Sequence, residues 1–206
     1  MHKKVSIDGN SRTKILDAAL EEFAVKGLAG ARVDKIAQNA KINKAMIYYH
    51  FSSKEKLYEK VIEREITEVV HRLRLELKEE SDPEKLFLAI ANQYMRVVSE
   101  KLEVGFIVLR EVMDGGERLR NVFSQIFKRY KVPRRLVEYI IKGQKEGRFR
   151  QMDPRHVMIS FIGMNLFYLQ TQRVANTVWE IDDEEKFLGE RPDHVVDLFL
   201  HGLLAR

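Results

Sequence analysis

The chain has 206 residues, of which 45% are apolar and 33% charged, enough apolar material for one or two packed domains. It contains no cysteine, which excludes a disulfide scaffold and thiol catalysis and fits a reducing cytoplasm. The N-terminus lacks the apolar segment of a secretory signal, and the longest apolar run, 157–169, is too short to cross a bilayer. We therefore expect a cytoplasmic protein without membrane contact.

The formal charge of +5 is concentrated at the N-terminal end of the chain. The segment up to Lys60 holds 12 lysines and arginines against 7 acidic residues, whereas the remainder holds 24 of each. A basic module joined to a neutral one is typical of a nucleic-acid-binding protein with a second domain. Short basic segments also arise by chance, so the charge alone does not decide.

In chain order, we expect residues 1–10 to form a flexible basic arm and Ser11 to cap the first helix, which Gly27 ends in the left-handed conformation. A two-turn second helix is predicted by apolar residues at helical spacing, namely Val33, Ile36, Ala37 and Ala40. After a four-residue turn, Asn43 is a good N-cap for a short third helix with Ile47 and Phe51 on its buried side. Two short helices joined in this way form a helix-turn-helix, whose second helix can enter a major groove.

A long fourth helix is predicted to open at a capping box made by Ser52 and Glu55 and to continue to about Lys78. Further helices are expected over 83–102, 104–114, 117–145 with a break or kink at Pro133, 154–176 and, after an acidic loop over 181–191, 192–204. No segment alternates with a period of two, so no strand is expected and the fold class is all-α.

The residues from Ile36 to Leu57 read I-A-x-x-A-x-I-N-x-A-x-I-Y-Y-H-F-x-x-K-E-x-L. This string resembles the DNA-binding signature of the TetR family of bacterial transcriptional regulators, and the match extends over about 11–57. The resemblance implies an N-terminal three-helix DNA-binding domain over 11–57, followed by a larger helical ligand-binding and dimerisation domain over 58–206. It also implies a homodimer that reads a palindromic operator in double-stranded DNA.

The resemblance implies DNA contacts for residues on and beside the third helix. Lys44 and Ala45 would reach base edges, because lysine donates to guanine and a small alanine permits close approach. The other contacts would fall mainly on phosphates. The expected DNA-binding residues are Arg32, Asn43, Lys44, Ala45, Tyr48, Tyr49, His50 and Lys54.

Two positions depart from the family pattern. Lys41 stands where members usually have glycine, so either Lys41 adopts a positive φ or the turn differs. The second helix lacks the usual serine or threonine at its start; Arg32 could replace the phosphate contact but not the cap.

The C-terminal part is rich in aromatic residues and methionine, which suit a bulky apolar effector as well as a plain helical core. The resemblance implies a ligand pocket here, with Asn165 as a polar group able to orient the ligand. The expected pocket residues are Phe106, Met113, Phe123, Phe127, Tyr139, Phe161, Asn165 and Tyr168. Glu111 and Asp114 could face a cationic ligand but are interpreted as solvated surface.

The last two helices resemble the dimerisation helices of the family and would form a two-fold four-helix bundle. The expected interface residues are Gly163, Val195, Val196, Leu198, Phe199 and Leu203.

No catalytic motif is present, and Asp193, His194 and Asp197 are interpreted as helix-start residues rather than metal ligands, so we expect no enzyme activity, metal or cofactor. The best interpretation is a ligand-responsive regulator, with repression favoured. Three alternatives remain open: a regulator without small-molecule control, an activator or coregulator with a protein partner, and a helical carrier or enzyme that no longer binds DNA.

Overall fold

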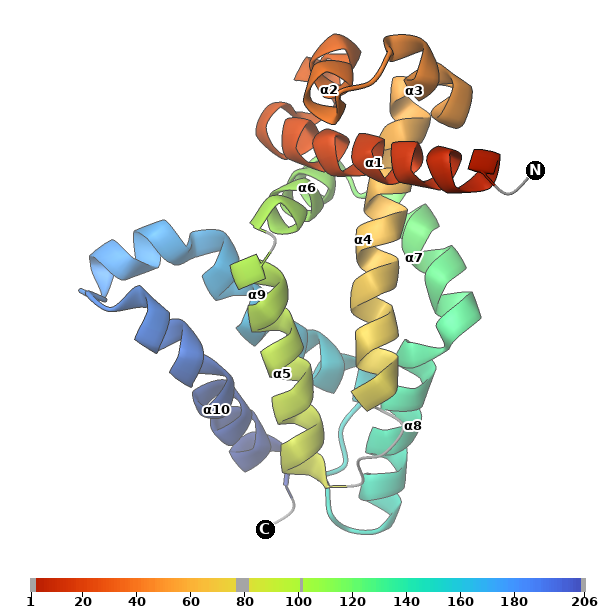
Figure 1. The fold of residues 1–206 in the computed structure, drawn as a ribbon. Helices are drawn as coiled ribbons and strands as arrows, with labels where there is room; N and C mark the ends of the chain where they lie inside the picture. Colours follow the sequence, from red (N-terminus) through yellow and green to blue (C-terminus); the bar gives the residue numbers. More distant parts are fainter. Residues whose placement is uncertain (1–2, 77–81, 101, 205–206) are drawn as a thin grey trace. The chain divides into compact units, whose positions relative to one another are not determined.

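The computed structural model describes residues 3–76, 82–100 and 102–204, and every regular element within them is a helix (Figure 1). The helices are α1 (Lys3–Gly30), α2 (Val33–Ala40), α3 (Lys44–Phe51), α4 (Lys54–Glu76), α5 (Pro83–Glu100), α6 (Leu102–Met113), α7 (Glu117–Tyr130), α8 (Val132–Lys145), α9 (Pro154–Val178) and α10 (Glu184–Leu203). In the same residues the only β-type pairing is an isolated bridge between Phe149 and Leu204. The all-α prediction is confirmed, whereas the predicted end of the fourth helix near Lys78 lies outside the described residues.

The chain divides into two compact units. The first contains α1, α2, α3, α4 up to Thr67, α6, and α7 up to Gln125. The second contains the end of α4, α5, the end of α7, α8, α9 and α10. The predicted DNA-binding domain, 11–57, lies within the first unit, and its boundary at residue 57 stays a prediction.

Helix α1 supplies one apolar face to the core of the first unit. Phe23 is fully buried and its ring meets the ring of Tyr58 from α4 edge-on, with centroids 4.8 Å apart. The helix begins at Lys3, so Ser11 is not its cap and residues 3–10 are helical. Whether that segment moves as an arm stays a prediction. Gly27 has a positive φ of 65°, as expected, but its ψ of 177° is not that of a left-handed helical residue, and it interrupts α1 before the last turn instead of ending it.

The turns around α3 are set by local hydrogen bonds. The side chain of Asn43 accepts a hydrogen bond from Ala45 N at 2.8 Å, which confirms the predicted N-cap. At the next junction the predicted cap is wrong by one residue, because Ser53 Oγ accepts from Lys56 N at 3.1 Å. Ser52 instead ends α3 with φ 65°.

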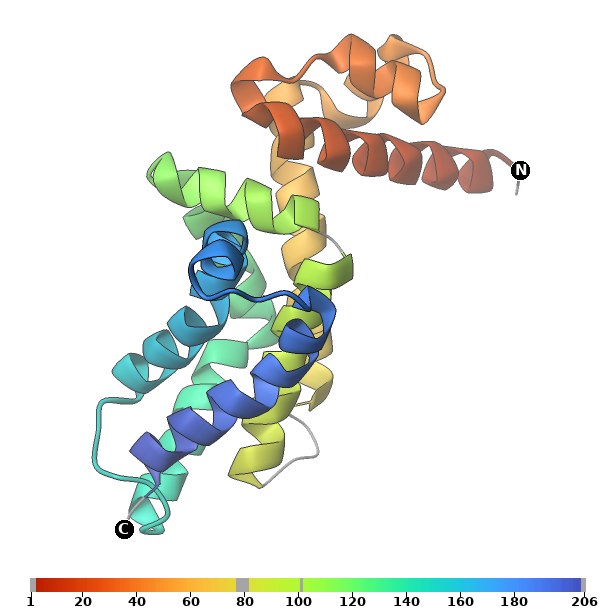
Figure 2. The same cartoon turned by 90° about the vertical axis from the view of Figure 1, so that its left-hand side faces the viewer.

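Three phenylalanines form the centre of the second unit, where α5, α9 and α10 pack together. The ring centroids of Phe87, Phe161 and Phe199 lie 4.8 to 4.9 Å apart in all three pairs. Figure 2 shows α10, which carries Phe199, running along α5, which carries Phe87.

Two proline positions had different outcomes. Near Pro133 the predicted break is confirmed, because Lys131 adopts φ 56° and separates α7 from α8. Pro192, in contrast, does not start the last helix. Helix α10 begins at Glu184, where Asp183 accepts from Lys186 N at 3.0 Å, so the predicted loop over 181–191 is largely helical. An acidic first turn and a capping carboxylate favour this earlier start, and the helix tolerates the proline inside it.

Candidate nucleic-acid interface

Helices α2 and α3 form the predicted helix-turn-helix on one side of α1 (Figure 1). The apolar face of α2 is buried as expected, and α3 buries Ile47 and Phe51 at 0% and 4% exposure. In the turn, Lys41 has φ 55° and ψ 46°, so it adopts the left-handed conformation usually taken by glycine. Its backbone N–H then donates to the α2 carbonyls of Ala37 and Gln38 and closes the helix without a glycine.

The opposite face of α3 is open to solvent. Lys44 and Ala45 are exposed at its start, and Tyr48 and Tyr49 are 45% and 74% exposed one turn later. His50 is half-buried, and its ring meets that of Tyr49 edge-on at 5.1 Å. This surface presents ammonium, hydroxyl and imidazole groups beside small side chains, the chemistry suited to phosphates and base edges.

Lys44 forms an ion pair across the turn that sequence reasoning did not find. Its Nζ lies 2.8 Å from Asp34 Oδ1 on α2, and both side chains are exposed. The hydrogen bond from Lys44 lowers the pKa of Asp34, and the same bond raises the pKa of Lys44. Both groups are therefore charged at neutral pH.

The two basic residues expected to hold phosphates are placed differently. Arg32 is exposed just before α2; it adds no side-chain cap, and its backbone N donates to Glu22 Oε1 at 3.1 Å. Lys54 is half-buried, and its Nζ donates to the carbonyls of Ala29 and Ala31, each at 3.3 Å. Lys54 thus ties the start of α4 to the segment before α2, a structural role that the sequence did not indicate. Its phosphate contact stays a prediction.

The residues predicted for the ligand pocket fall into both units. Phe106 and Met113 on α6 are 51% and 78% exposed in the first unit, where Phe123 is half-buried. In the second unit, Phe127 and Tyr139 are half-buried.

The other three predicted pocket residues share the buried face of α9. Phe161 and Asn165 are fully buried and Tyr168 is 4% exposed. Asn165 donates to the carbonyl of Phe161 at 2.8 Å, while its own side-chain oxygen has no hydrogen-bond partner among the described residues. The guanidinium of Arg191 lies over the Tyr168 ring, 4.8 Å from its centroid. This cluster is the part of the predicted pocket that the fold brings together.

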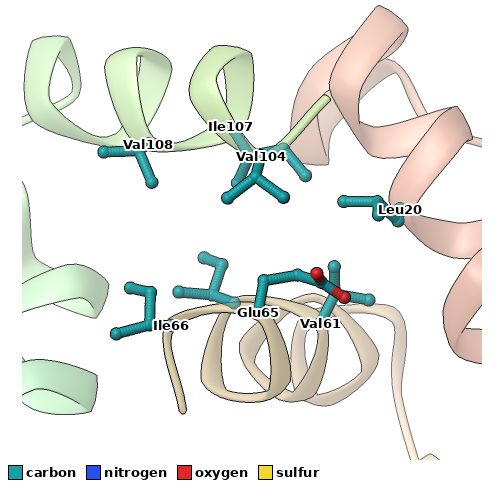
Figure 3. Close-up of a pocket in the computed structure, with 8 residues that line it drawn as sticks. Leu20, Val61, Glu65, Ile66, Val104, Ile107 and Val108 are labelled. Atoms are coloured by element: carbon teal, nitrogen blue, oxygen red, sulfur yellow. The ribbon is translucent and has the colours of Figure 1, made fainter. Parts of the chain in front are cut away.

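A small hollow in the first unit lies elsewhere, between α1, α4 and α6 (Figure 3). It encloses about 10 Å³, room for about one water molecule. None of the residues that line it was among the predicted pocket residues. They are Leu20, Val61, Ile62, Glu65, Ile66, Val104, Ile107 and Val108. Glu65 is 3% exposed and pairs with Arg64 at 2.6 Å.

Glu111 is not on the solvated surface, contrary to its interpretation from the sequence, whereas Asp114 is exposed. The Glu111 side chain is 2% exposed and lies 3.3 Å from Arg118 Nη1. Burial and the neighbouring Glu111 carboxylate raise the pKa of Tyr58. These three residues form a polar cluster joining α4, α6 and α7, which no local pattern in the sequence reveals.

Of the six predicted interface residues, four are core residues of their own protomer: Val195, Val196, Phe199 and Leu203, all 8% exposed or less. Leu198 is 65% exposed, and Gly163 is exposed with open space around it. A surface seam on α10 would therefore use Leu198 rather than those four side chains.

The outward face of α9 carries an apolar stripe that the sequence did not single out. It consists of Ile159, Gly163, Phe167, Val174 and Val178, at helical spacing, and its four side chains other than glycine are 60 to 68% exposed. It lies opposite the buried face that holds Phe161, Asn165 and Tyr168. Contiguous exposed apolar patches are typical of interaction surfaces, whereas single exposed apolar residues are ordinary.

Comparison with known proteins gives consistent matches over both units. Residues 15–61 match the family described as bacterial regulatory proteins, tetR family, and residues 83–198 match the tetracyclin repressor-like C-terminal domain. The HTH-type transcriptional repressor NicS of Pseudomonas putida is 28% identical over 201 residues, which cover 94% of this chain and 92% of that protein.

Two solved structures share the fold. The transcriptional regulator FadR from Bacillus subtilis, in complex with stearoyl-CoA, has a TM-score of 0.73 and 20% identity, covering 92% of this chain and 98% of that one. The ketosteroid transcriptional regulator KstR2 of Mycobacterium tuberculosis has a TM-score of 0.72 and 18% identity, covering 95% of each chain.

Among the helices that the structure describes, none combines the length and the apolar character that a membrane span requires.

Proposed function

This chain belongs to the TetR family of bacterial regulatory proteins, and from that premise we propose that it acts as a homodimeric repressor whose hold on DNA is controlled by a small, largely apolar molecule. As a family member it is a DNA-binding transcriptional regulator, and its relatives are regulators rather than enzymes. Repression is supported by the similarity to the repressor NicS over nearly the whole chain.

The observation that carries the DNA-binding proposal is the exposed face of α3. Lys44, Tyr48 and Tyr49 project from a helix whose other side is locked into the unit by Ile47 and Phe51. A rigid helix with exposed donors is what base readout requires, because the donors must keep their register along the groove. We assign Lys44 and Ala45 to base edges and Arg32, Asn43, Tyr48, Tyr49, His50 and Lys54 to the phosphates and sugars.

The dimer is supported by the apolar stripe on α9 and by the exposed Leu198 on α10. Two copies related by a two-fold axis would bury both stripes, and the absence of a side chain at Gly163 would let the two helices approach closely. A dimer also explains how one short reading helix per protomer gains specificity, since two copies read two half-sites about 34 Å apart or a multiple of that distance. The operator is therefore proposed to be a palindrome in double-stranded DNA.

Effector control is supported by the buried face of α9. Asn165 has a buried oxygen without a partner among aromatic side chains, the arrangement expected where a ligand supplies the missing donor. Of the two structural relatives, FadR was solved in complex with stearoyl-CoA and KstR2 is a ketosteroid transcriptional regulator, and both descriptions are consistent with a bulky apolar effector. We propose that the effector binds beside Phe161, Asn165 and Tyr168, with Phe127 and Tyr139 on the same unit.

Helix α4 is the proposed mechanical link, because its first residues belong to the first unit and Glu68–Glu76 belong to the second. An effector that binds one conformer more tightly would shift α4 and change the spacing of the two α3 helices. The size of the effect is bounded by the difference in the effector's affinity for the two conformers.

The proposal is tested by gel shifts of the full-length protein against its own upstream region over a salt series. We expect a saturable complex whose affinity falls steeply with salt, as ion release from phosphates requires. Binding that is absent at low salt, or that shows no preference over random duplex, contradicts it.

Regulation without a small molecule is a second candidate, favoured by one observation. The hollow in the first unit has room for about one water molecule. Native mass spectrometry of the purified protein, with and without a panel of fatty acyl and steroid compounds, separates the two candidates. A bound compound that also weakens DNA binding supports effector control, whereas binding of none with unchanged DNA affinity supports the alternative.

A further inference from the structure

One carboxylate lies on the surface proposed to face DNA. Asp34 is the second residue of α2 and Lys44 the first residue of α3, and the 2.8 Å ion pair between them bridges the turn. The side chains are 63% and 47% exposed, so solvent and DNA can both reach the pair. An acid here opposes phosphate binding, because it adds a negative charge among the cations that attract the backbone.

Asp34 and Lys44 each stabilise the ionised form of the other. The hydrogen bond between the two residues lowers the pKa of Asp34 and raises the pKa of Lys44, so both stay ionised near neutral pH. Arg32 acts on the same pair, stabilising the Asp34 carboxylate and disfavouring the charge on Lys44. Lys44 also lies at the positive end of α3, where a cation is disfavoured unless an anion offsets it.

We propose that Asp34 is a specificity-determining residue of the reading surface, because it holds the Lys44 ammonium so that only an uncharged acceptor can join it. A lysine ammonium has three N–H donors, so it can keep Asp34 and still donate to a second acceptor. A phosphate in that position would sit next to the Asp34 carboxylate and be repelled. A guanine edge offers neutral O6 and N7 acceptors and meets no such repulsion. The remaining N–H donors of Lys44 therefore favour a base edge over a phosphate.

This inference rests on the proposed DNA-binding function and names one determinant of its specificity. It is tested with the full-length protein by fluorescence anisotropy over a salt series, on a duplex that the protein selects from a random pool and on an unselected duplex. The Asp34→Asn variant removes the charge and keeps the size and hydrogen-bonding oxygen of the side chain. We expect its affinity for unselected duplex to rise about three- to tenfold, and the salt slope to steepen by about one phosphate per protomer. The preference for the selected duplex falls accordingly.

Lys44→Ala completes a double-mutant cycle. As a single substitution, we expect Lys44→Ala to weaken binding to the selected duplex. It should leave the salt slope on unselected duplex nearly unchanged. In the Asp34→Asn background it should abolish the gain on unselected duplex, because the released ammonium is then the source of that gain.

Asp17→Asn is the matched control. Asp17 is 61% exposed and pairs with Arg64 at 2.7 Å, so the variant removes the same charge from a similarly exposed carboxylate that is also ion-paired, on α1 instead of α2. We expect it to leave the salt slope unchanged. Thermal melts of all variants report whether the fold is retained, which we expect because both carboxylates are exposed.

Three outcomes overturn the inference alone: an unchanged slope for Asp34→Asn, an equal effect of Asp17→Asn, or an equally large loss on unselected duplex for Lys44→Ala in the unchanged protein. Failure of the unchanged protein to bind either duplex overturns the proposed function and the inference with it.

Discussion

Phe167 tests the proposed dimer surface most sharply, because its side chain contributes little to the fold of its own protomer. It is 68% exposed on the outward face of α9. An aromatic side chain buries about 200 Å² when fully covered, so roughly 140 Å² remains for a partner to cover. At about 25 cal/mol per Å², covering half of that area in both protomers contributes about 3.5 kcal/mol. Since about 1.4 kcal/mol is a tenfold change, Phe167→Ser should raise the dimer Kd about three-hundredfold.

Sedimentation equilibrium over a concentration series measures that Kd, and thermal melts of the same samples report the fold. Two valines of nearly equal exposure give a matched control: Val174 in the stripe is 66% exposed and Val25 on α1 is 69% exposed. We expect Val174→Ser to weaken the dimer and Val25→Ser to leave it unchanged. An unchanged Kd for Phe167→Ser, or equal effects of the two valine variants, refutes the assignment of the stripe to the dimer.

The remaining predictions concern the fold. Gly143→Ala should lower stability by about 1–3 kcal/mol in a urea melt, because the new Cβ would lie 2.1 Å from Cδ2 of the buried Phe149 ring. Lys41→Gly should stabilise the protein by about 0.5–1 kcal/mol, because an L-residue at φ 55° costs roughly 1–2 kcal/mol and glycine's greater chain entropy offsets part of it. Asp153→Asn should lose stability near pH 7 and not near pH 2: hydrogen bonds from Arg155 lower the Asp153 pKa from 3.8 to about 2, so the stabilisation is present above pH 3.8 and lost as the pH falls through about 2.

For each of these three variants, a control or a pH series tests the physical cause given for the change in stability. Gly105→Ala is the control for Gly143→Ala, since its Cβ would meet nothing within 4 Å, and the two should differ in sign. Lys35→Gly, inside α2, should destabilise where Lys41→Gly stabilises. A stability difference for Asp153→Asn that stays constant from pH 7 to pH 2 would show that its charge is not the cause.

The helix-turn-helix was predictable because its determinants are local. The apolar spacing of α2, the Asn43 cap and the buried pair on α3 all act within a few residues, and each is found in the structure. Lys41 was identified as anomalous from its position alone, and its positive φ resolves the two possibilities that the sequence left open.

The sequence-based predictions failed where two local signals competed, or where contacts between residues distant in the sequence determined the outcome. Proline is common at a helix start, which favoured Pro192. Instead, the Asp183 cap and the acidic residues after it begin α10 at Glu184, about two turns earlier, and the proline lies inside the helix. Glu111 is polar and was interpreted as surface, but Arg118 compensates its charge in the interior. The pair of Asp34 and Lys44 depends on how the turn orients two helices, which no spacing rule gives.

The residues predicted for the dimer interface on α10 were misjudged for a similar reason. An apolar periodicity identifies the buried face of a helix without saying whether its own protomer or a partner buries it. Val195 and Phe199 are buried by the protomer, while the exposed stripe on α9 was recognisable only after the helices were packed.

Site-specific photo-crosslinking tests the central claim, that α3 lies in the major groove, most directly. A benzophenone-bearing amino acid is placed at Tyr49, which is 74% exposed on α3, and in a second protein at Val25, which is 69% exposed on α1. With duplex from the protein's own upstream region, we expect crosslinks from position 49 at two places about one helical turn, or a multiple of it, apart, and none from position 25. Crosslinks from position 25 alone, or equal yields from both positions, would contradict it.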